Sequence, residues 1–471
     1  LNEKITPVFP AKFRAGGRAD GEPTKLEVLD EYTFTMSFEE PYGGFLREIT
    51  VKGWSGYTDL LKPAHYLKQF HAQYTPLEEL KPLLEKEQLK DEWWQLFNLK
   101  DFTNWEQTQA ASIGFPVLTP WCLVRASGGV YEWERNPYYF KVDTAGNQLP
   151  YIDRLASVQV QDAEMANMKV LTGEVDFLRE STALVNMPLY KQSEEKAGFR
   201  VSLLDSHVDP TCLFLNLTYE DVNWREVVRD VEFRRALNMA INREEIIDSV
   251  YYGFASLPET VPGEYNIEKS NKLLDDIGLG DRNPEGWRIG PDGEVFDILI
   301  ECGAHAPDLM PVAELLVEHF KEIGIKTVLK RVDPSLIAQR LASNEVQGYV
   351  IWNVQPMWRD GTWTDYLPDA QWAPEWQRWY TTNGKEGEEP PADIKYLYEI
   401  HEGRQAAIPY STQDIELTNE MYSLFQENIY FFPMVEKAKN PLITPANLKN
   451  VPKSGQAIGA NIRAEQFFFE E

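Results

Sequence analysis

The feature that most constrains the fold is a regular alternation of helical and strand patterns between residues 231 and 354. Three segments place apolar residues at helical spacing, and three short apolar runs are typical of buried strands. The helical segments are 231–253, 266–280 and 307–324, and the strand-like runs are FDILIEC (296–302), IKTVLKRV (325–332) and GYVIWNV (348–354). Helices that alternate with buried strands predict an α/β sheet with helices on its faces.

The first half of the chain has a different pattern. Residues 26–40 (LEVLDEYTFTMSFEE) alternate at period two and predict a pair of strands, and residues 75–99 carry apolar positions at helical spacing. From about residue 113 the pattern is mostly extended, with further strands expected in 154–161 and 200–218. A chain of 471 residues is long enough for two or three domains.

Charge excludes one class of partner. The chain has 46 Lys and Arg against 74 Asp and Glu, a net charge of −28. A field of that sign repels phosphate backbones, so we expect no nucleic-acid binding. There is no run of 18 apolar residues, so the sequence predicts no transmembrane helix.

The cysteines and histidines do not form a metal-binding pattern. Cys122, Cys212 and Cys302 are widely separated, and no Cys-x-x-Cys motif occurs. They are interpreted as small apolar core residues, with a single disulfide as the open alternative. We expect neither a metal nor another cofactor.

The stretch 350–366 (VIWNVQPMWRDGTWTDY) is chemically the richest and follows a predicted strand. In open α/β sheets ligands bind outside the carboxyl ends of strands. Flat aromatic faces beside polar groups are typical of a specific pocket. The predicted ligand-binding residues are Trp352, Asn353, Gln355, Trp358 and Asp360. The alternative is a packed loop with structural tryptophans.

An enzyme is the rival class of function. Glu375 or Asp360 beside tryptophans could form a two-carboxylate glycosidase cleft. Against this, the chain has no GxSxG, HExxH, P-loop or GxGxxG motif. We therefore expect no catalysis, and we weigh a purely structural or adhesive role equally low.

Residues 132–154 (EWERNPYYFKVDTAGNQLPYIDR) closely resemble the "ERNPxYW…LPYLD" segment of family 5 extracellular solute-binding proteins, the receptors of peptide- and nickel-class ABC importers. Four further segments resemble the family in the same order along the chain. They are LEVLDEYTFTMSFEEPYGGFL (26–46), VRDVEFRRALNMAINREEII (228–247), the span 268–300 from EKSNKLLDDIGLG to PDGEVFDILI, and HFKEIGIKTVLKRVD (319–333).

The resemblance implies a fold class: a two-lobed α/β periplasmic-binding-protein-like fold of type II, in the large peptide-binding class. The ligand cleft is expected between lobes joined by crossing strands. The implied division is 1–110 as the remainder of an extra domain attached to lobe I, 111–213 as lobe I, 214–434 as lobe II, and 435–471 as a return to lobe I. The family's opening strands have no counterpart here, so the resemblance implies that an N-terminal part is missing.

The implied function is capture of an oligopeptide-sized ligand by hinge closure and its delivery to a membrane permease. The expected protein is a monomer, periplasmic or extracellular, with or without a lipid anchor. In peptide-binding members a Trp is followed three residues later by an Asp that pairs with the ligand's amino group, whereas Gln355 follows Trp352 here. Asp360 is a candidate substitute, and the neutral amide favours the alternative of an oligosaccharide ligand.

Overall fold

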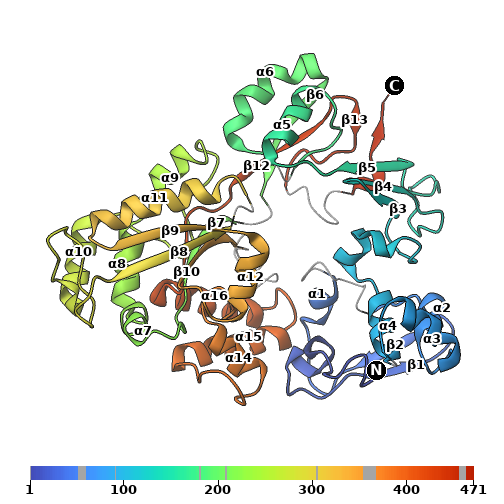
Figure 1. The fold of residues 1–471 in the computed structure, drawn as a ribbon, viewed down its shortest axis with the longest axis horizontal. Coiled ribbons are helices and arrows are strands. Elements are labelled where there is room, and N and C mark those ends of the chain that lie inside the picture. Colours follow the sequence, from blue (N-terminus) through green and yellow to red (C-terminus); the bar gives the residue numbers. More distant parts are fainter. Residues whose placement is uncertain are drawn as a thin grey trace. The chain divides into compact units, whose positions relative to one another are not determined.

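The computed structural model describes residues 2–50, 60–90, 92–179, 182–206, 209–303, 306–353, 367–455 and 463–470. The chain divides into two compact units (Figure 1). Unit 1 comprises Leu1–Lys169, Pro445–Pro452 and Ile458–Glu471, and unit 2 comprises Val170–Thr444 and Lys453–Ala457. Within the described residues, no helix combines the length and the apolar character needed to cross a bilayer.

Unit 2 is built on a five-stranded sheet in the order β11-β7-β10-β8-β9. The strands are β7 (Asp209–Leu215), β8 (Asp297–Gly303), β9 (Lys326–Val332), β10 (Gly348–Asn353) and β11 (Phe431–Pro433). β8 pairs in parallel with both β9 and β10, while β7 is antiparallel to β10 and β11. This is the α/β sheet that the alternating pattern predicts.

Two helices provide the crossovers between the parallel strands. α11 (Leu309–Glu322) joins β8 to β9 and buries Val312, Leu316 and Phe320 at helical spacing. It ends just before Gly324, whose φ of +77° suits a glycine after a helix. α12 (Pro334–Ala342) joins β9 to β10 and starts at Asp333, whose carboxylate accepts from the Ser335 amide. The helices pack along the sheet (Figure 1).

The other helices of unit 2 surround the same core. They are α7 (Val222–Val228), α8 (Val231–Ala240), α9 (Arg243–Ser249), α10 (Ile267–Leu274), α14 (Pro374–Thr381), α15 (Ala392–Ala406) and α16 (Thr412–Asn428). Side-chain caps start α7 to α10, where Asp221, Asp230, Asn242 and Asn266 each accept from a backbone amide of the first turn. Buried aromatic residues of α8 and α16, such as Phe233 and Phe425, belong to one large core.

A smaller part of unit 2 is a strand pair with helices. β6 (Phe199–Asp205) pairs with β12 (Lys439–Pro445), and α6 (Met187–Ala197) packs beside them. α5 (Ala163–Leu171) precedes this part in the chain and spans the boundary between the two units. Two connectors link this pair to the large sheet, one from β6 to β7 and one from β11 to β12. The Ser206 amide donates to the Ala438 carbonyl oxygen at 2.9 Å, which ties the two connectors together.

Unit 1 contains small sheets and short helices. Its sheets are β1 (Lys25–Val28) with β2 (Phe34–Ser37), β3 (Trp121–Ser127) with β4 (Val130–Arg135) and β5 (Arg154–Val158), and β13 (Leu448–Lys449) with β14 (Phe468–Phe469). Its helices are α1 (Phe45–Thr50), α2 (Ala64–Leu67), α3 (Leu77–Lys86) and α4 (Trp93–Lys100). Leu80, Leu84, Trp93 and Leu96 form the core of the α3–α4 pair.

The turn segment 136–151 in unit 1 is held by side chains bonding to backbone. Asn136 Nδ2 donates to the carbonyl oxygens of Val117 (3.1 Å) and Thr119 (3.0 Å). Asp143 accepts from Asn147 and Tyr151, and these hydrogen bonds lower its pKa to about 2. These hydrogen bonds hold the segment that connects β4 to β5.

Candidate ligand-binding edge

Four strand ends meet at one edge of the large sheet. The parallel strands β8, β9 and β10 finish there at Gly303, Val332 and Asn353. Antiparallel β7 begins there, because Asp209 lies opposite Asn353 and Cys212 opposite Ile351. We call this the carboxyl edge; it is the position at which α/β sheets bind ligands.

Exposure increases abruptly along β10 at this edge. Tyr349, Val350 and Ile351 are buried, whereas Trp352 is 37% exposed. The β7–β10 register shifts between Ile351 and Asn353, so a bulge lies at the same position. A bulge at the end of a strand re-aims side chains, and a large indole ring there provides a flat apolar face at the carboxyl edge.

A chain of hydrogen bonds crosses three elements beside Trp352. Asp308 lies at the start of α11, Tyr251 follows α9, and Thr211 lies near the start of β7. The Tyr251 hydroxyl donates to Asp308 Oδ2 at 2.8 Å and lies 2.9 Å from Thr211 Oγ1. Asp308 makes no side-chain cap to α11, so its carboxylate is turned to Tyr251 instead. We call these three residues the edge triad.

Burial dominates the electrostatics of the edge triad. Desolvation raises the pKa of Asp308 to about 6, opposed by the hydrogen bonds from Tyr251 and from its own backbone amide. The neighbouring Cys302 thiol has its pKa raised to about 12, first by burial and then by the Asp308 charge. A carboxyl group with a pKa near neutrality at a strand end is a candidate functional group.

A fully buried carboxylate, that of Glu436, lies on the connector that leaves β11. Glu436 Oε1 accepts from the Thr260 amide at 2.9 Å, and Ser256 and Glu436 exchange backbone hydrogen bonds. Arg243 Nε donates to the Pro433 carbonyl oxygen at 2.9 Å. Burial lowers the pKa of Arg243 to about 10, while Cys212 and Glu436 oppose the change. These contacts fix the connector against the loop around residue 256.

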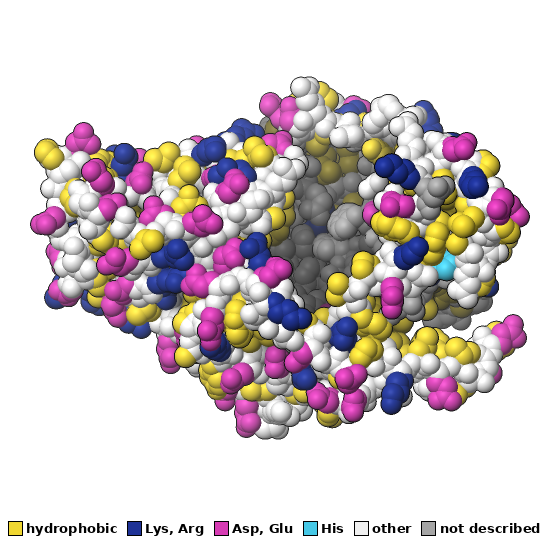
Figure 2. Space-filling view, turned by 60° about the horizontal axis from the view of Figure 1, so that its bottom comes forward, with side chains coloured by type: hydrophobic (Ala, Val, Ile, Leu, Met, Phe, Trp, Pro, Cys, Tyr) yellow, Lys and Arg dark blue, Asp and Glu magenta, His cyan; other side chains and the backbone are white. Residues whose placement is uncertain are grey.

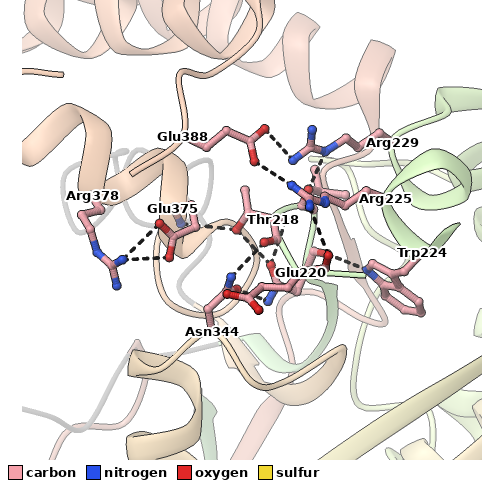
Figure 3. Close-up of polar contacts among 11 residues, drawn as sticks. Thr218, Glu220, Trp224, Arg225, Arg229, Asn344, Glu375, Arg378 and Glu388 are labelled. Atoms are coloured by element: carbon pink, nitrogen blue, oxygen red, sulfur yellow. Dashed lines mark hydrogen bonds and ion pairs between the residues drawn. The ribbon is translucent and has the colours of Figure 1, made fainter. Parts of the chain in front are cut away.

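The opposite, amino end of β10 carries a dense polar network (Figure 3). Asn216 Nδ2 donates to Asn344 Oδ1 (2.7 Å) and to the Val346 carbonyl oxygen (2.9 Å). Asn216 Oδ1 accepts from the Thr218 amide at 2.9 Å, and Trp224 Nε1 donates to the Asn216 carbonyl oxygen at 2.7 Å. The network joins the end of β7 to the residues that precede β10.

Ion pairs extend this network outward (Figure 3). Glu388 pairs with Arg225 (3.1 Å) and Arg229 (2.8 Å). Glu375, considered above as a glycosidase acid, pairs with Arg378 at 3.0 Å. Its backbone amide donates to the Thr218 hydroxyl at 3.3 Å. The structure thus gives Glu375 an ion-pair partner in a structural cluster. Asp360, the alternative glycosidase acid, lies outside the described residues.

The structure describes two of the five predicted ligand-binding residues. Trp352 lies at the carboxyl edge, as expected from the strand before it. Asn353 ends β10, where its backbone pairs with Asp209. Gln355, Trp358 and Asp360 lie outside the described residues. The ligand-binding role of all five stays a prediction.

Sequence reasoning missed Tyr251 and Asp308. Asp308 follows strand β8 and directly precedes helix α11, so an acid at a strand-to-helix junction was the available signal. Tyr251 gave no such signal, because its role depends on a contact with a residue 57 positions away.

Among the described residues, no group of three His, Cys, Asp or Glu side chains could hold a metal ion. All three cysteines are free, and Cys212 and Cys302 are buried as predicted.

The sequence of residues 6–383 matches the profile of the bacterial extracellular solute-binding proteins, family 5 Middle. The chain belongs to this family. Family 5 proteins are transport receptors, in agreement with the resemblance seen in the sequence. The fold class is confirmed by solved structures of periplasmic binding proteins.

Two curated relatives of this family 5 chain are longer than the chain and share about a quarter of its residues over the matched parts. A periplasmic α-galactoside-binding protein of Rhizobium meliloti is 24% identical over 69% of this chain and 46% of its own length. The oligopeptide-binding protein AppA of Bacillus subtilis is 25% identical over 45% of this chain and 39% of its own length. The chain thus spans less than half of the length of these relatives.

Two solved structures illustrate the fold of the family 5 chain. An oligopeptide-binding protein OppA aligns with a TM-score of 0.62 and 28% identity, covering 100% of this chain and 78% of that chain. MelB of Agrobacterium fabrum C58, solved with stachyose, aligns with a TM-score of 0.73 and 19% identity, covering 98% of this chain and 68% of that chain. At that identity the likeness to MelB concerns the fold alone.

Proposed function

We propose that this protein is the solute-binding receptor of an ABC importer, which captures an oligopeptide-sized ligand and delivers it to a membrane permease. The observation that carries the proposal is the carboxyl edge, where Trp352 emerges from a buried strand beside the edge triad. Membership of family 5 supports the same role.

The proposed mechanism is closure around the ligand without chemistry. A ligand that contacts more residues in a closed state than in an open one shifts the population toward the closed state. The two connectors, β6 to β7 and β11 to β12, are the proposed hinge, because they carry the chain out of the five-stranded sheet and back. Lobe I is proposed as 111–213 with 435–471, lobe II as 214–434, and 1–110 as part of an extra domain.

The proposal extends to partners and location. The receptor works as a monomer with permease subunits of the membrane, in the periplasm or outside the cell. Surface charge is compatible with a dissolved receptor: acidic and basic side chains are intermingled on the face shown in Figure 2. A net charge of −28 keeps such a protein apart from other anionic macromolecules.

An oligosaccharide is the second candidate ligand. A relative named for α-galactosides and a structural neighbour solved with stachyose favour it. The chemistry also suits it, since the CH faces of a sugar pack on an indole ring such as that of Trp352. The neutral amide of Gln355 adds hydrogen bonds without charge.

The test is thermal melting against two ligand panels, short peptides and short oligosaccharides. A ligand present at 100 times its Kd stabilises the protein by about 2.7 kcal/mol, which gives a clear rise in Tm. A rise with peptides supports the first ligand class, and a rise with sugars supports the second. The receptor proposal fails if neither panel raises Tm.

Substitution of the predicted contacts locates the site. Trp352, Asn353, Gln355, Trp358 and Asp360 are each replaced by alanine, and the Tm rise is measured with the active panel. Leu336→Ala on α12 is a matched surface control, because that side chain is half exposed and belongs to neither the edge triad nor the predicted set. Loss of the Tm rise in the five variants but not in the control supports the assignment.

A further inference from the structure

We propose that Lys437 is the pivot at which the connector from β11 to β12 bends, and that Glu436 anchors one side of this pivot. The inference rests on the receptor function proposed above, because it names the residues at which closure takes place. Both residues belong to unit 2 and lie between the five-stranded sheet and the β6–β12 pair.

Up to Glu436 the connector is bound to the five-stranded sheet and to the loop after α9. The Met434 amide donates to the Thr211 carbonyl oxygen of β7 at 3.0 Å. Glu436 and Ser256 exchange two backbone hydrogen bonds, of 2.8 and 2.9 Å. Met434, Val435 and Glu436 are all fully buried. This side of the connector therefore moves with the large sheet.

After Lys437 the connector is bound to the other strand pair. The Ala438 carbonyl oxygen accepts from the Ser206 amide at 2.9 Å. Lys439, the first residue of β12, forms an ion pair with Asp205, the last residue of β6. The change of partners falls at Lys437, so rotation about its backbone bonds would turn one group of contacts against the other.

The backbone of Lys437 marks the same position. Its φ of +52° lies in the left-handed region, which a residue with a side chain rarely occupies. Lys437 and Ala438 lie opposite the single residue Ala255, between the backbone pair described above and a 2.9 Å hydrogen bond from the Lys439 amide to the Phe254 carbonyl oxygen. Two residues opposite one form a β-bulge, and a bulge bends its strand.

The anchor is a carboxylate that is paired only in part. Glu436 Oε1 accepts from the Thr260 amide, whereas Oε2 has no hydrogen-bond partner among the described residues. Arg243 interacts with this carboxylate electrostatically but gives its hydrogen bonds to Pro433 and Asn238. Burial of an incompletely paired carboxylate lowers stability, so its position is better explained by what it holds than by stability.

The loop that Glu436 holds also reaches the carboxyl edge. We call residues 251–261 the clamp loop. It begins at Tyr251, the central member of the edge triad, and its Glu259 pairs with Lys437 Nζ at 2.5 Å. The clamp loop therefore joins the candidate ligand site to the fixed side of the pivot. Through it, contacts at the edge can bias the open and closed populations.

The test measures the distance between two spin labels in the unliganded full chain by double electron–electron resonance. The labels are attached at Glu195→Cys on α6 and Glu314→Cys on α11, which lie on the two sides of the pivot and are both exposed. Cys122→Ser removes the half-buried native thiol, while the other two cysteines are buried.

Lys437→Gly is the decisive variant. Glycine occupies both signs of φ, so we expect the distance distribution to become about twofold broader. Lys437→Ala removes the ion pair with Glu259 but keeps the Cβ atom, so its distribution should match that of the parent. Asn383→Gly is the matched backbone control, because Asn383 also has a positive φ of +56° but follows α14. It should leave the distribution unchanged.

The anchor is tested by two substitutions of Glu436. Glu436→Ala should broaden the distribution as Lys437→Gly does, because it releases Thr260, whereas Glu436→Gln keeps an acceptor oxygen and should match the parent. Glu301→Ala removes another fully buried carboxylate, which pairs with Arg340, and should lower stability without broadening. If Glu436→Ala does not fold, the comparison of Lys437→Gly with Lys437→Ala still decides the pivot.

Ligand addition connects the pivot to closure. Tetra-alanine and stachyose are the probes, and the one that raises Tm should narrow the broad distribution of Lys437→Gly. Its Kd for this variant, measured by calorimetry, should be about fivefold above that of the parent, because a smaller fraction of the free protein is competent to bind.

The outcomes separate this inference from the receptor function. Equal distributions in Lys437→Gly and the parent, or equal broadening by Lys437→Ala or Asn383→Gly, overturn the pivot and leave the receptor function standing. An unchanged distribution in folded Glu436→Ala overturns the anchor. Failure of both ligand panels to raise Tm rejects the receptor proposal, and with it the role of this pivot in closure, whatever the distances show.

Discussion

The two ends of strand β7 differ in how completely their polar groups are paired within the protein. At its carboxyl end, Asn216 satisfies its amide oxygen and nitrogen within 3.1 Å of protein partners, and ion pairs brace the surroundings. At its amino end, the edge triad holds a carboxylate with a raised pKa and no ion pair among the described residues, beside a tryptophan that emerges from the core.

The contrast separates stability from binding within one sheet. Polar groups whose hydrogen bonds are all made inside the protein have no free donor or acceptor for a ligand. Removing one of them leaves its buried partners without hydrogen bonds and lowers the free energy of unfolding. Groups that are paired only in part lower the stability of the free protein but supply binding energy when a ligand arrives. We therefore expect substitutions at the two ends to affect different measurements.

Asn216→Ala should give the largest loss of stability. It removes the hydrogen bonds to Asn344, Val346 and Thr218 and leaves their buried polar groups unpaired. We expect the free energy of unfolding to fall by about 3 kcal/mol, measured by urea denaturation. Ligand affinity of the folded fraction should be unchanged; a large change in affinity would contradict the division between the ends.

The pH dependence of stability should reveal the cost of the carboxylate at the other end. The folded pKa of Asp308, about 6, lies above its usual 3.8. The stabilising contribution of the protonated form is complete below pH 4 and is lost as pH rises through 6. Relative to Asp308→Asn, the unliganded protein should lose about 2 kcal/mol between pH 4 and pH 7.

Urea denaturation at each pH checks this difference. Because both proteins share every other titrating group, the difference between their curves isolates Asp308. Parallel curves for the two proteins would show that this carboxyl group is well solvated in the folded state, and the contrast between the ends would then weaken.

Trp352→Ala should affect binding more than stability. The side chain is 37% exposed, so its truncation should lower the free energy of unfolding by less than about 1 kcal/mol. Lost contact with the ligand should raise Kd about tenfold, measured by calorimetry with the active panel. Trp376→Ala, which truncates a buried tryptophan near the other end, should show the reverse pattern.

Glu388→Gln should have the smallest effect. Its two ion pairs with Arg225 and Arg229 are partly exposed and screened by salt. We expect the free energy of unfolding to fall by about 0.5 kcal/mol at low salt and by less in 1 M NaCl. Thermal melting at the two salt concentrations measures this difference. A larger loss that persists in high salt would show that this network is effectively buried.

Strong periodicity predicted much of unit 2. The predicted helical segment 307–324 contains α11, and the segment 231–253 contains α8 and α9. The predicted strand 348–354 contains β10. Helix α15 was missed, because its apolar residues surround the helix rather than forming one stripe. A proline in a helix interior usually bends or divides the helix, yet α3 continues through Pro82 to Lys86. The burial of Leu80 and Leu84 in the core stabilises this helix despite the low helix propensity of proline.

The candidate site was predictable only in part. Trp352 follows a strand in the sequence, so its place at the carboxyl edge could be inferred from local pattern. The edge triad could not, because Thr211, Tyr251 and Asp308 are brought together by the sheet and by α11 rather than by spacing. The helical spacing of Trp372, Trp376 and Trp379 predicts one face of a core helix. Trp372 and Trp376 are buried, but α14 begins at Pro374, after the first of them.

The predicted ligand contacts Trp352 and Asn353 are the last two residues of β10, and this position has a consequence for evolution. Trp352 lies at the opposite end of the sheet from Asn216, so its replacement is expected to leave the network around Asn216 intact. Under the proposed function, a lineage could then change its ligand by changing a few side chains. The fold can therefore be conserved while the ligand specificity changes.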